Sequence, residues 1–437
     1  MWKRAAGRRK LIVISLALVS VILVSFVTLA YFSRGNQNPA FNLSAAYAAS
    51  DQKAYSVDPR LVSANTGFAF DLFKVLLAED VNTNVFISPL SVSIALAMLY
   101  NGAESMTRDA MAKTLNFGNM TLDEINQEYS NLIQSLENVD QSVNLLIGNS
   151  VWMRQEFAPF VKPSFLQGVG TSYNSEIYTR DFGNPQTVGE INHWVDKQTE
   201  GRIQQIINNL DPALVMLLIN AIYFKGTWTT QFDKSKTQKQ DFFLSDGSNV
   251  TVDMMTASGN FSYYSGETCE VARLPYGRDK VAMYIFLPKE GVSLGSFAAG
   301  LNQTVHDDYI RGLQPLDGLI VKMPKFHVEY GVKLLNDALN SLGMGVVFNP
   351  VQANFTGIAS TALGNLYVSY VDHKAVVEVN EEGTVAAAVT SVGIHIAAVI
   401  PGYPPSFVVD RPFYYEIRDD RSGSILFIGE MLNPAGT

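Results

Sequence analysis

The sequence predicts an α+β fold built as one large domain, with helices in the first third of the chain and antiparallel strands after it. Apolar residues recur at helical spacing between about residues 65 and 115, and later they alternate or run unbroken between Gly and Pro signals. After the N-terminal segment no Pro/Ser/Gly-rich linker or internal repeat divides the chain, and 47% of its residues are hydrophobic. One large core is therefore expected.

Three helices are expected in the first third. The first carries Phe68, Leu72 and Leu76 at helical spacing. Pro89 begins the second, which runs to Tyr100, because proline is favoured in the first turn of a helix. The third covers residues 109–115.

The remaining elements are expected to be mainly strands. Residues 145–152 change from helical to strand periodicity, and the apolar run at 214–224 is long enough for a central strand. Shorter strands are expected at 271–274, 281–287, 319–323, 367–371, 374–380 and 413–417.

Residues 381–390 have the sequence EEGTVAAAVT, in which two acids and a glycine precede small uncharged residues. The chain then contains no Lys or Arg before Arg411. A loop of twenty-odd residues inside a compact domain is usually functional or disordered. Its alternating small side chains could slide between two existing strands at little steric cost. The segment is therefore predicted to be a spare strand.

Seven motifs, together with this segment, resemble the serpin family in order and content, from about residue 65 to the C-terminus. They are NVFISPLS at 84–91, GAE at 102–104 with Thr107, INHWV at 191–195 with Thr199 and Gly201, NAIYFKGTW at 220–228, MPKF at 323–326, LGM at 342–344, and DRPF at 410–413 with ILFIG at 425–429. Asn354 departs from the usual family Asp, and Glu430 and Met431 replace a usual basic residue and Val.

The resemblance implies a serpin fold of three β-sheets and eight or nine helices, with an exposed reactive-centre loop at about 381–405. It implies an irreversible inhibitor of serine proteases, not an enzyme, in which the cleaved loop inserts into the main sheet as a new strand. At about 3.3 Å per residue, insertion from Gly383 to Ala397 would drag the acylated protease roughly 46 Å and stop deacylation. It assigns the hinge to Glu381, Glu382, Gly383, Thr384, Val385, Ala386, Ala387 and Ala388.

The inward-facing residues of the inserting strand test this expectation. Alternation from the hinge selects seven positions with neither charge nor proline: Thr384, Ala386, Ala388, Thr390, Val392, Ile394 and Ile396. Val389 is larger than the family norm and Gly393 weakens a strand, so both reduce the expected efficiency of insertion.

Two counts place the scissile bond differently. The family spacing from Glu381 puts it between Ala397 and Ala398, whereas counting back from the DRPF motif puts it near Pro401. The hinge count is preferred because insertion fixes that length, although residues 396–400 all stay open. Without Lys or Arg in this stretch, a protease with a small apolar pocket, elastase-like or subtilisin-like, is the expected target.

The resemblance also singles out a polar cluster near the centre of the main sheet. Its members are Ser88, Ser91, Asn220 and His373, which hold two strands together or let them part. Satisfying buried backbone groups is an equally compatible role. Trp228 matches the family tryptophan near the start of insertion, or is simply a large core residue.

The N-terminal segment is expected to be separate from the main domain. Five Lys and Arg residues precede an uncharged run from Leu11 to Phe32, which would form a helix of about 33 Å, long enough to span a membrane. An uncleaved anchor (1–32) with the main domain outside the cell is preferred over a signal peptide. A flexible tether (33–60) would then lead to the serpin domain (61–437). An inhibitory, membrane-anchored or exported prokaryotic-type member is expected.

Composition argues against several other functions. The net charge of −9 disfavours nucleic-acid binding, and the acidic stretch at 121–128 disfavours a heparin-like activator. The single Cys269 cannot form an intramolecular disulfide, and five scattered histidines suggest no metal; no cofactor is expected. A non-inhibitory serpin acting as a binding or chaperone-like module is the alternative.

A remoter alternative is a hydrolase using Ser293, because residues 291–295 match the G-x-S-x-G nucleophile pattern. Three residues separate the preceding strand from the first glycine of this match, whereas the motif requires a direct turn. Ser293 is therefore expected to cap a helix at 296–301.

Overall fold

The computed structural model describes residues 57–137, 139–359, 365–384 and 405–436. The predicted membrane anchor from Leu11 to Phe32, the hinge residues from Val385 to Ala388 and the predicted scissile bond between Ala397 and Ala398 lie outside these residues.

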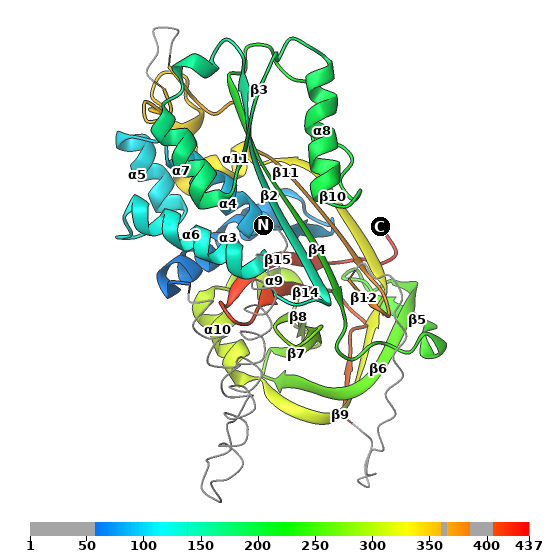
Figure 1. Cartoon of the computed structure of the whole chain (residues 1–437). Helices are drawn as coiled ribbons and strands as arrows, with labels where there is room; N and C mark the ends of the chain where they lie inside the picture. The colour runs from blue at the N-terminus through cyan, green and yellow to red at the C-terminus, as the bar shows by residue number, and fades with distance from the viewer. Residues whose placement is uncertain (1–56, 138, 360–364, 385–404, 437) are drawn as a thin grey trace, which may run out of the picture. The chain divides into compact units, whose positions relative to one another are not determined.

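Nine α-helices occur among the described residues (Figure 1). They are α3 (Pro59–Glu79), α4 (Pro89–Tyr100), α5 (Ser105–Thr114), α6 (Leu122–Glu137), α7 (Pro163–Tyr173), α8 (Gln186–Gln198), α9 (Leu294–Gly300), α10 (Gln303–Gly312) and α11 (Asn336–Leu339).

The strands form two hydrogen-bonded sheets in the described part of the chain. The six-stranded sheet has the order β10-β11-β12-β4-β2-β3: β10 (Phe326–Leu334), β11 (Asp372–Val379), β12 (Gly383–Thr384), β4 (Met216–Thr227), β2 (Val143–Arg154) and β3 (Glu176–Arg180). The nine-stranded sheet contains β1 (Val85–Ile87), β15 (Ser424–Met431), β14 (Phe413–Asp419), β8 (Val281–Pro288), β7 (Cys269–Tyr276), β6 (Asn249–Ser265), β9 (Gln314–Pro324), β13 (Ser406–Val408) and β5 (Gln238–Phe243).

One long strand explains why the three expected sheets join into two. The first part of β6 pairs with β5, and its end pairs with β7, while β9 runs along its other edge. Because β6 spans 17 residues, it belongs to both halves of the larger sheet. The predicted α+β architecture is confirmed.

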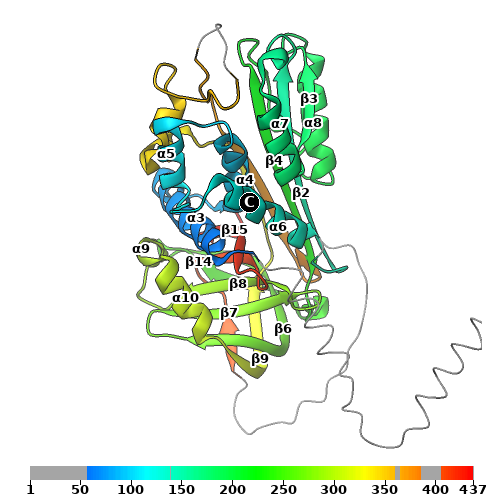
Figure 2. The same cartoon turned by 60° about the vertical axis from the view of Figure 1, so that its left-hand side comes forward.

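The apolar interior of the described residues forms two cores, one on each face of β2 and β4. Helix α4 packs against β4 of the six-stranded sheet and β15 of the other, and nearly all its residues are buried. On the opposite face of β2 and β4 lies α8, seen beside these strands in Figure 2, where Trp152, Trp194 and Ile219 belong to a second cluster. Strands β2 and β4 are therefore covered on both faces.

Most predicted elements are observed, several of them with shifted ends; the helix expected at 109–115, for example, is α5, which begins at Ser105. Helix α4 has the predicted bounds, and the central strand begins at Met216 rather than at residue 214. Helix α3 begins at Pro59, with Asp58 as its N-cap, so Pro59 and Arg60 belong to the helix and not to the expected tether.

The prediction of a strand at residues 367–371 is wrong. This stretch has no regular structure, because its backbone N–H groups donate to groups outside any strand. The Val368 N–H donates to the Val347 carbonyl, and the Val371 N–H donates to the Asn336 side chain. The strand starts only at Asp372.

Among the described residues, α3 is the one helix long and apolar enough to cross a membrane. Its Leu61, Phe68, Leu72 and Leu76 are fully buried, so its apolar composition is that of a core helix.

Candidate functional site

The two-residue strand β12 lies between β11 and β4, at the lower end of the long strands in Figure 1. Thr384 stands opposite Val379 on one side and Gly226 on the other, in antiparallel register with both. Its side chain is only 1% exposed, and its hydroxyl lies 2.6 Å from the Tyr276 hydroxyl. The first inward-facing residue of the predicted strand is therefore already inside the sheet.

A tight turn joins β11 to β12. The Asn380 N–H donates to the Gly383 carbonyl (3.0 Å), and the Asn380 side-chain oxygen accepts from the Glu382 N–H (3.0 Å). A Cβ added at Gly383 would lie 2.0 Å from the Gly226 carbonyl oxygen. Only glycine fits here, because the opposing group is backbone and has little freedom to move.

Trp228 holds the outside of this turn. Its backbone N–H donates to the Glu382 carbonyl (3.0 Å), and its indole N–H donates to the Asn380 carbonyl (2.9 Å). Its ring stacks on Tyr276 with 4.3 Å between centroids. Trp228 is thus both a buried core residue and a direct partner of the hinge.

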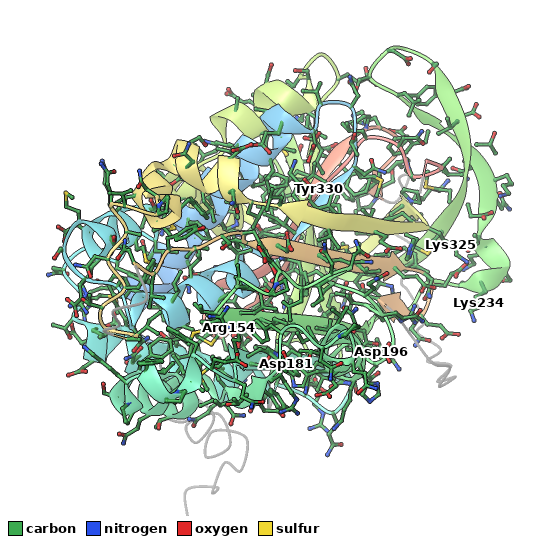
Figure 3. All side chains as sticks on the ribbon, turned by 90° about the horizontal axis from the view of Figure 1, so that it is seen from above. Arg154, Asp181, Asp196, Lys234, Lys325 and Tyr330 are labelled. Atoms are coloured by element: carbon green, nitrogen blue, oxygen red, sulfur yellow. The ribbon has the colours of Figure 1, made fainter. Side chains whose placement is uncertain are left out.

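Each hinge glutamate has a lysine partner. Glu381, 6% exposed, pairs with Lys325 (3.0 Å) and accepts a hydrogen bond from the Thr237 hydroxyl (2.8 Å). Burial alone would raise the pKa of Glu381, but these hydrogen bonds outweigh it and hold the pKa below the usual value. Glu382 pairs with Lys234. Figure 3 shows both lysines at the same end of the sheet.

Beyond β12, β4 and β11 share no hydrogen-bonded ladder in the described part of the chain. A cavity of about 360 Å³ lies along the start of both strands instead. Its lining includes consecutive residues of β4 and β11 on two sides and helix α4, among them Met216, Leu218, Asn220, His373, Val92 and Leu96. Among the described residues, the starts of β4 and β11 therefore face this cavity and are not paired with each other.

The structure brings the four predicted cluster residues together beside this cavity. His373 Nε2 accepts the Ser88 N–H (3.1 Å), so this nitrogen is unprotonated, and burial lowers the pKa of His373 to about 4. The Ser88 hydroxyl accepts the Ser91 N–H (3.2 Å), and the Ser91 hydroxyl donates to the Asn220 side chain. Asn220 donates in turn to Asn149 (2.7 Å). The network therefore links α4 to β11, β4 and β2.

Sequence reasoning did not assign several of these partners. Asn149 could have been found from the sequence, because it is a polar residue inside an apolar strand. Lys325 could also have been found, because it lies in the MPKF motif. Tyr276, Thr237 and Lys234 reach the hinge from distant segments. No sequence pattern singled them out.

The alternative sites have ordinary structural roles. Ser293 is the N-cap of α9, where its hydroxyl accepts the Ser296 N–H (3.1 Å), as predicted. Cys269 is buried, which raises the pKa of its thiol. Within the described ranges, no cluster of three His, Cys, Asp or Glu side chains is suited to a metal ion.

Comparison with known proteins identifies the family. The model of the family described as serpin (serine protease inhibitor) matches residues 63–434. The chain is a serpin. It is 34% identical to bovine serpin A3-6 over 393 residues, which cover 88% of this chain and 91% of that protein. A serpin-like protein of Thermococcus kodakarensis is 34% identical over 378 residues, covering 86% of each chain.

Solved serpin structures share the fold. The thermophilic serpin tengpin in its native state has a TM-score of 0.78 at 32% identity, covering 86% of this chain and 95% of its own. Thyroxine-binding globulin in complex with thyroxine has a TM-score of 0.75 at 31% identity, covering 85% and 99%. Serpins are in general protease inhibitors and not enzymes, and the family includes members of other function.

Proposed function

We propose that this serpin is an irreversible suicide-substrate inhibitor of serine proteases, which traps the acyl-enzyme by inserting its cleaved loop between β4 and β11. The observation that carries the proposal is β12: Gly383 and Thr384 already pair with both strands, and no ladder joins those strands beyond it in the described residues.

The register of β12 supports continued insertion. Thr384 opposes Val379 and Gly226, so six residues further along the loop Thr390 would oppose His373 and Asn220. Residues after Thr390 would pass the cavity at the start of both strands. The inward positions in this register, such as Ala386 and Ala388, are the small residues of the predicted alternation. Each inserted residue would add ladder hydrogen bonds, worth about 1 kcal/mol net apiece.

The polar cluster would control the separation of the two strands. Ser88 and Ser91 hold His373 on β11 and Asn220 on β4 through side-chain and backbone hydrogen bonds, and Thr390 would enter between these two residues. The remaining hinge residues from Val385 to Ala388 would follow Thr384 into the sheet.

The proposed target is a serine protease with a small apolar primary pocket, elastase-like or subtilisin-like. The support is the loop sequence: no Lys or Arg occurs between Gly383 and Asp410, and the hinge count puts the cut between Ala397 and Ala398. Because alanine contributes little binding energy, Ile394 and Ile396 would supply part of the recognition.

The proposed setting is the outer face of the cell membrane, with the uncharged run from Leu11 to Phe32 as anchor. Two features of the sequence support this proposal: the run is long enough to span a membrane as a helix, and basic residues precede it. Cleavage of this segment would give a secreted inhibitor.

A non-inhibitory binding serpin is the second candidate, favoured by the likeness to thyroxine-binding globulin, whose structure was determined with thyroxine. The small, uncharged residues after Gly383 weigh against it, because insertion needs side chains that tolerate burial.

One experiment separates these functions. Incubation of the chain with an elastase-like protease should give a covalent complex that survives boiling in detergent, and mass spectrometry of the released fragment should find Ala398 at its N-terminus. A start at Val399 or Ile400 would move the bond. Cleavage without any complex would reject inhibition, and complex formation with trypsin but not elastase would reject the proposed specificity.

A further inference from the structure

A short segment just before β5 makes hydrogen bonds and an ion pair with the β11–β12 turn. Residues 232–237, here called the clasp, include the 3-10 turn η2 (Lys234–Lys236). Asp233 accepts hydrogen bonds from the N–H (2.9 Å) and hydroxyl (2.6 Å) of Ser235, and its own N–H donates to the Thr256 carbonyl of β6 (3.2 Å). The clasp is thus fixed to β6.

Three bonds join the clasp to consecutive hinge residues. The Phe232 N–H donates to the Glu381 carbonyl (2.9 Å), and the Thr237 hydroxyl donates to the Glu381 carboxylate (2.8 Å). Lys234 reaches one residue further and pairs with the Glu382 carboxylate. The Glu382 side chain is 18% exposed, whereas that of Lys234 is 65% exposed. Lys234 is therefore the outermost of the three clasp contacts, next to Gly383.

We propose that Lys234 is a positioning residue for strand insertion: by holding Glu382 it fixes the turn from which β12 is extended between β4 and β11. The inference rests on the proposed inhibitory function and deepens it.

The physical reason is preorganisation. A fixed turn keeps Gly383 and Thr384 in register with Thr227 and Gly226, so insertion proceeds by adding residues to a ladder that already exists. A loose turn would first have to recover this register, at a cost in conformational entropy. After cleavage, insertion competes with deacylation of the protease, so a slower start would send more inhibitor to the cleaved, released product.

Substitution of Lys234 should therefore change the partition between covalent complex and released cleaved inhibitor more than it changes the rate of cleavage. An exposed ion pair is a modest interaction, so Lys234→Ala should lower the ratio of covalent complex to released cleaved inhibitor by about two- to fivefold. Lys234→Glu should lower it further, because a third carboxylate would then face Glu381 and Glu382.

Lys236 supplies a matched control. It lies on the same 3-10 turn, its side chain is 64% exposed, and it pairs with Asp233 rather than with the hinge. Lys236→Glu makes the same charge change and should leave the ratio as in the unmodified chain. The exchange Lys234→Glu with Glu382→Lys should restore the ratio that either single substitution lowers.

The ratio of covalent complex to released cleaved inhibitor is measured at low salt and at about 1 M NaCl, with the protease that forms the complex. At high salt Lys234→Ala should lower this ratio less, because exposed charges are screened. The rate at which the nicked chain gains thermal stability is a second readout of insertion that needs no trapped protease.

Equal ratios and insertion rates for Lys234→Glu and the unmodified chain would overturn the inference while leaving the proposed function intact. An equal fall with Lys236→Glu, or no recovery in the charge exchange, would also overturn it. If the unmodified chain gives neither a complex nor a gain in stability after nicking, the proposed function fails and the inference fails with it.

Discussion

Replacing Thr384 by Arg is the strongest test of insertion at the hinge. Thr384 is 1% exposed and sits between Gly226 and Val379, with its hydroxyl on Tyr276. Burial raises the pKa of Tyr276, as expected where water is largely excluded. A guanidinium placed there would be a buried charge with no countercharge among these neighbours, at a cost of about 3–5 kcal/mol.

The hinge of the variant would avoid this cost by leaving the sheet. Cleavage of the loop should then persist, because it needs no insertion, while the free-energy barrier to insertion rises. At about 1.4 kcal/mol per factor of ten, even 3 kcal/mol lowers the insertion rate roughly 100-fold relative to deacylation. The variant should behave as a substrate.

Detergent gels of timed incubations with an elastase-like protease measure both products. Thr384→Ser, which keeps the hydroxyl facing Tyr276, serves as the control and should form complex normally. Complex formation by Thr384→Arg at the yield of the unmodified chain would refute the reasoning.

Three further predictions concern stability. Nicking between Ala397 and Ala398 should raise the melting temperature, since the freed strand completes the sheet; equal melting before and after would indicate a non-inhibitory serpin. Burial lowers the pKa of His373 from about 6.5 to about 4, so as the pH falls the unfolded chain binds a proton at this histidine before the folded chain does. The free energy of unfolding should therefore keep its full value above about pH 6.5 and fall by up to about 3 kcal/mol as the pH drops to about 4. Urea titrations at several pH values should show a smaller loss for His373→Gln. Ser293→Ala removes a helix cap, so it should cost about 1 kcal/mol and leave complex formation unchanged; loss of an esterase activity would instead revive the hydrolase alternative.

The class of fold and the place where function is expected could both be predicted from the order of residues along the chain. Periodicity is a local property, so it located α4 with its proline at the N-terminus, the long strands β2 and β4, and the cap at Ser293. The run of small residues after Gly383 indicated the predicted hinge, because it is unusual for an ordinary strand. The same local evidence failed at residues 367–371, where alternation resembled a strand but Val347 and Asn336 take the backbone hydrogen bonds.

The contacts that hold the predicted hinge became visible in the folded chain alone. Tyr276, Lys325 and the clasp come from segments far from Glu381 in the sequence, and they reach the hinge through individual side-chain and backbone groups that no periodic pattern marks. The lack of pairing between β4 and β11 beyond β12, in the described residues, is likewise a relation between strands more than a hundred residues apart. Periodicity reports whether a residue is buried within its own element, whereas the partner across a sheet depends on how distant elements pack, and that is fixed only when the chain folds.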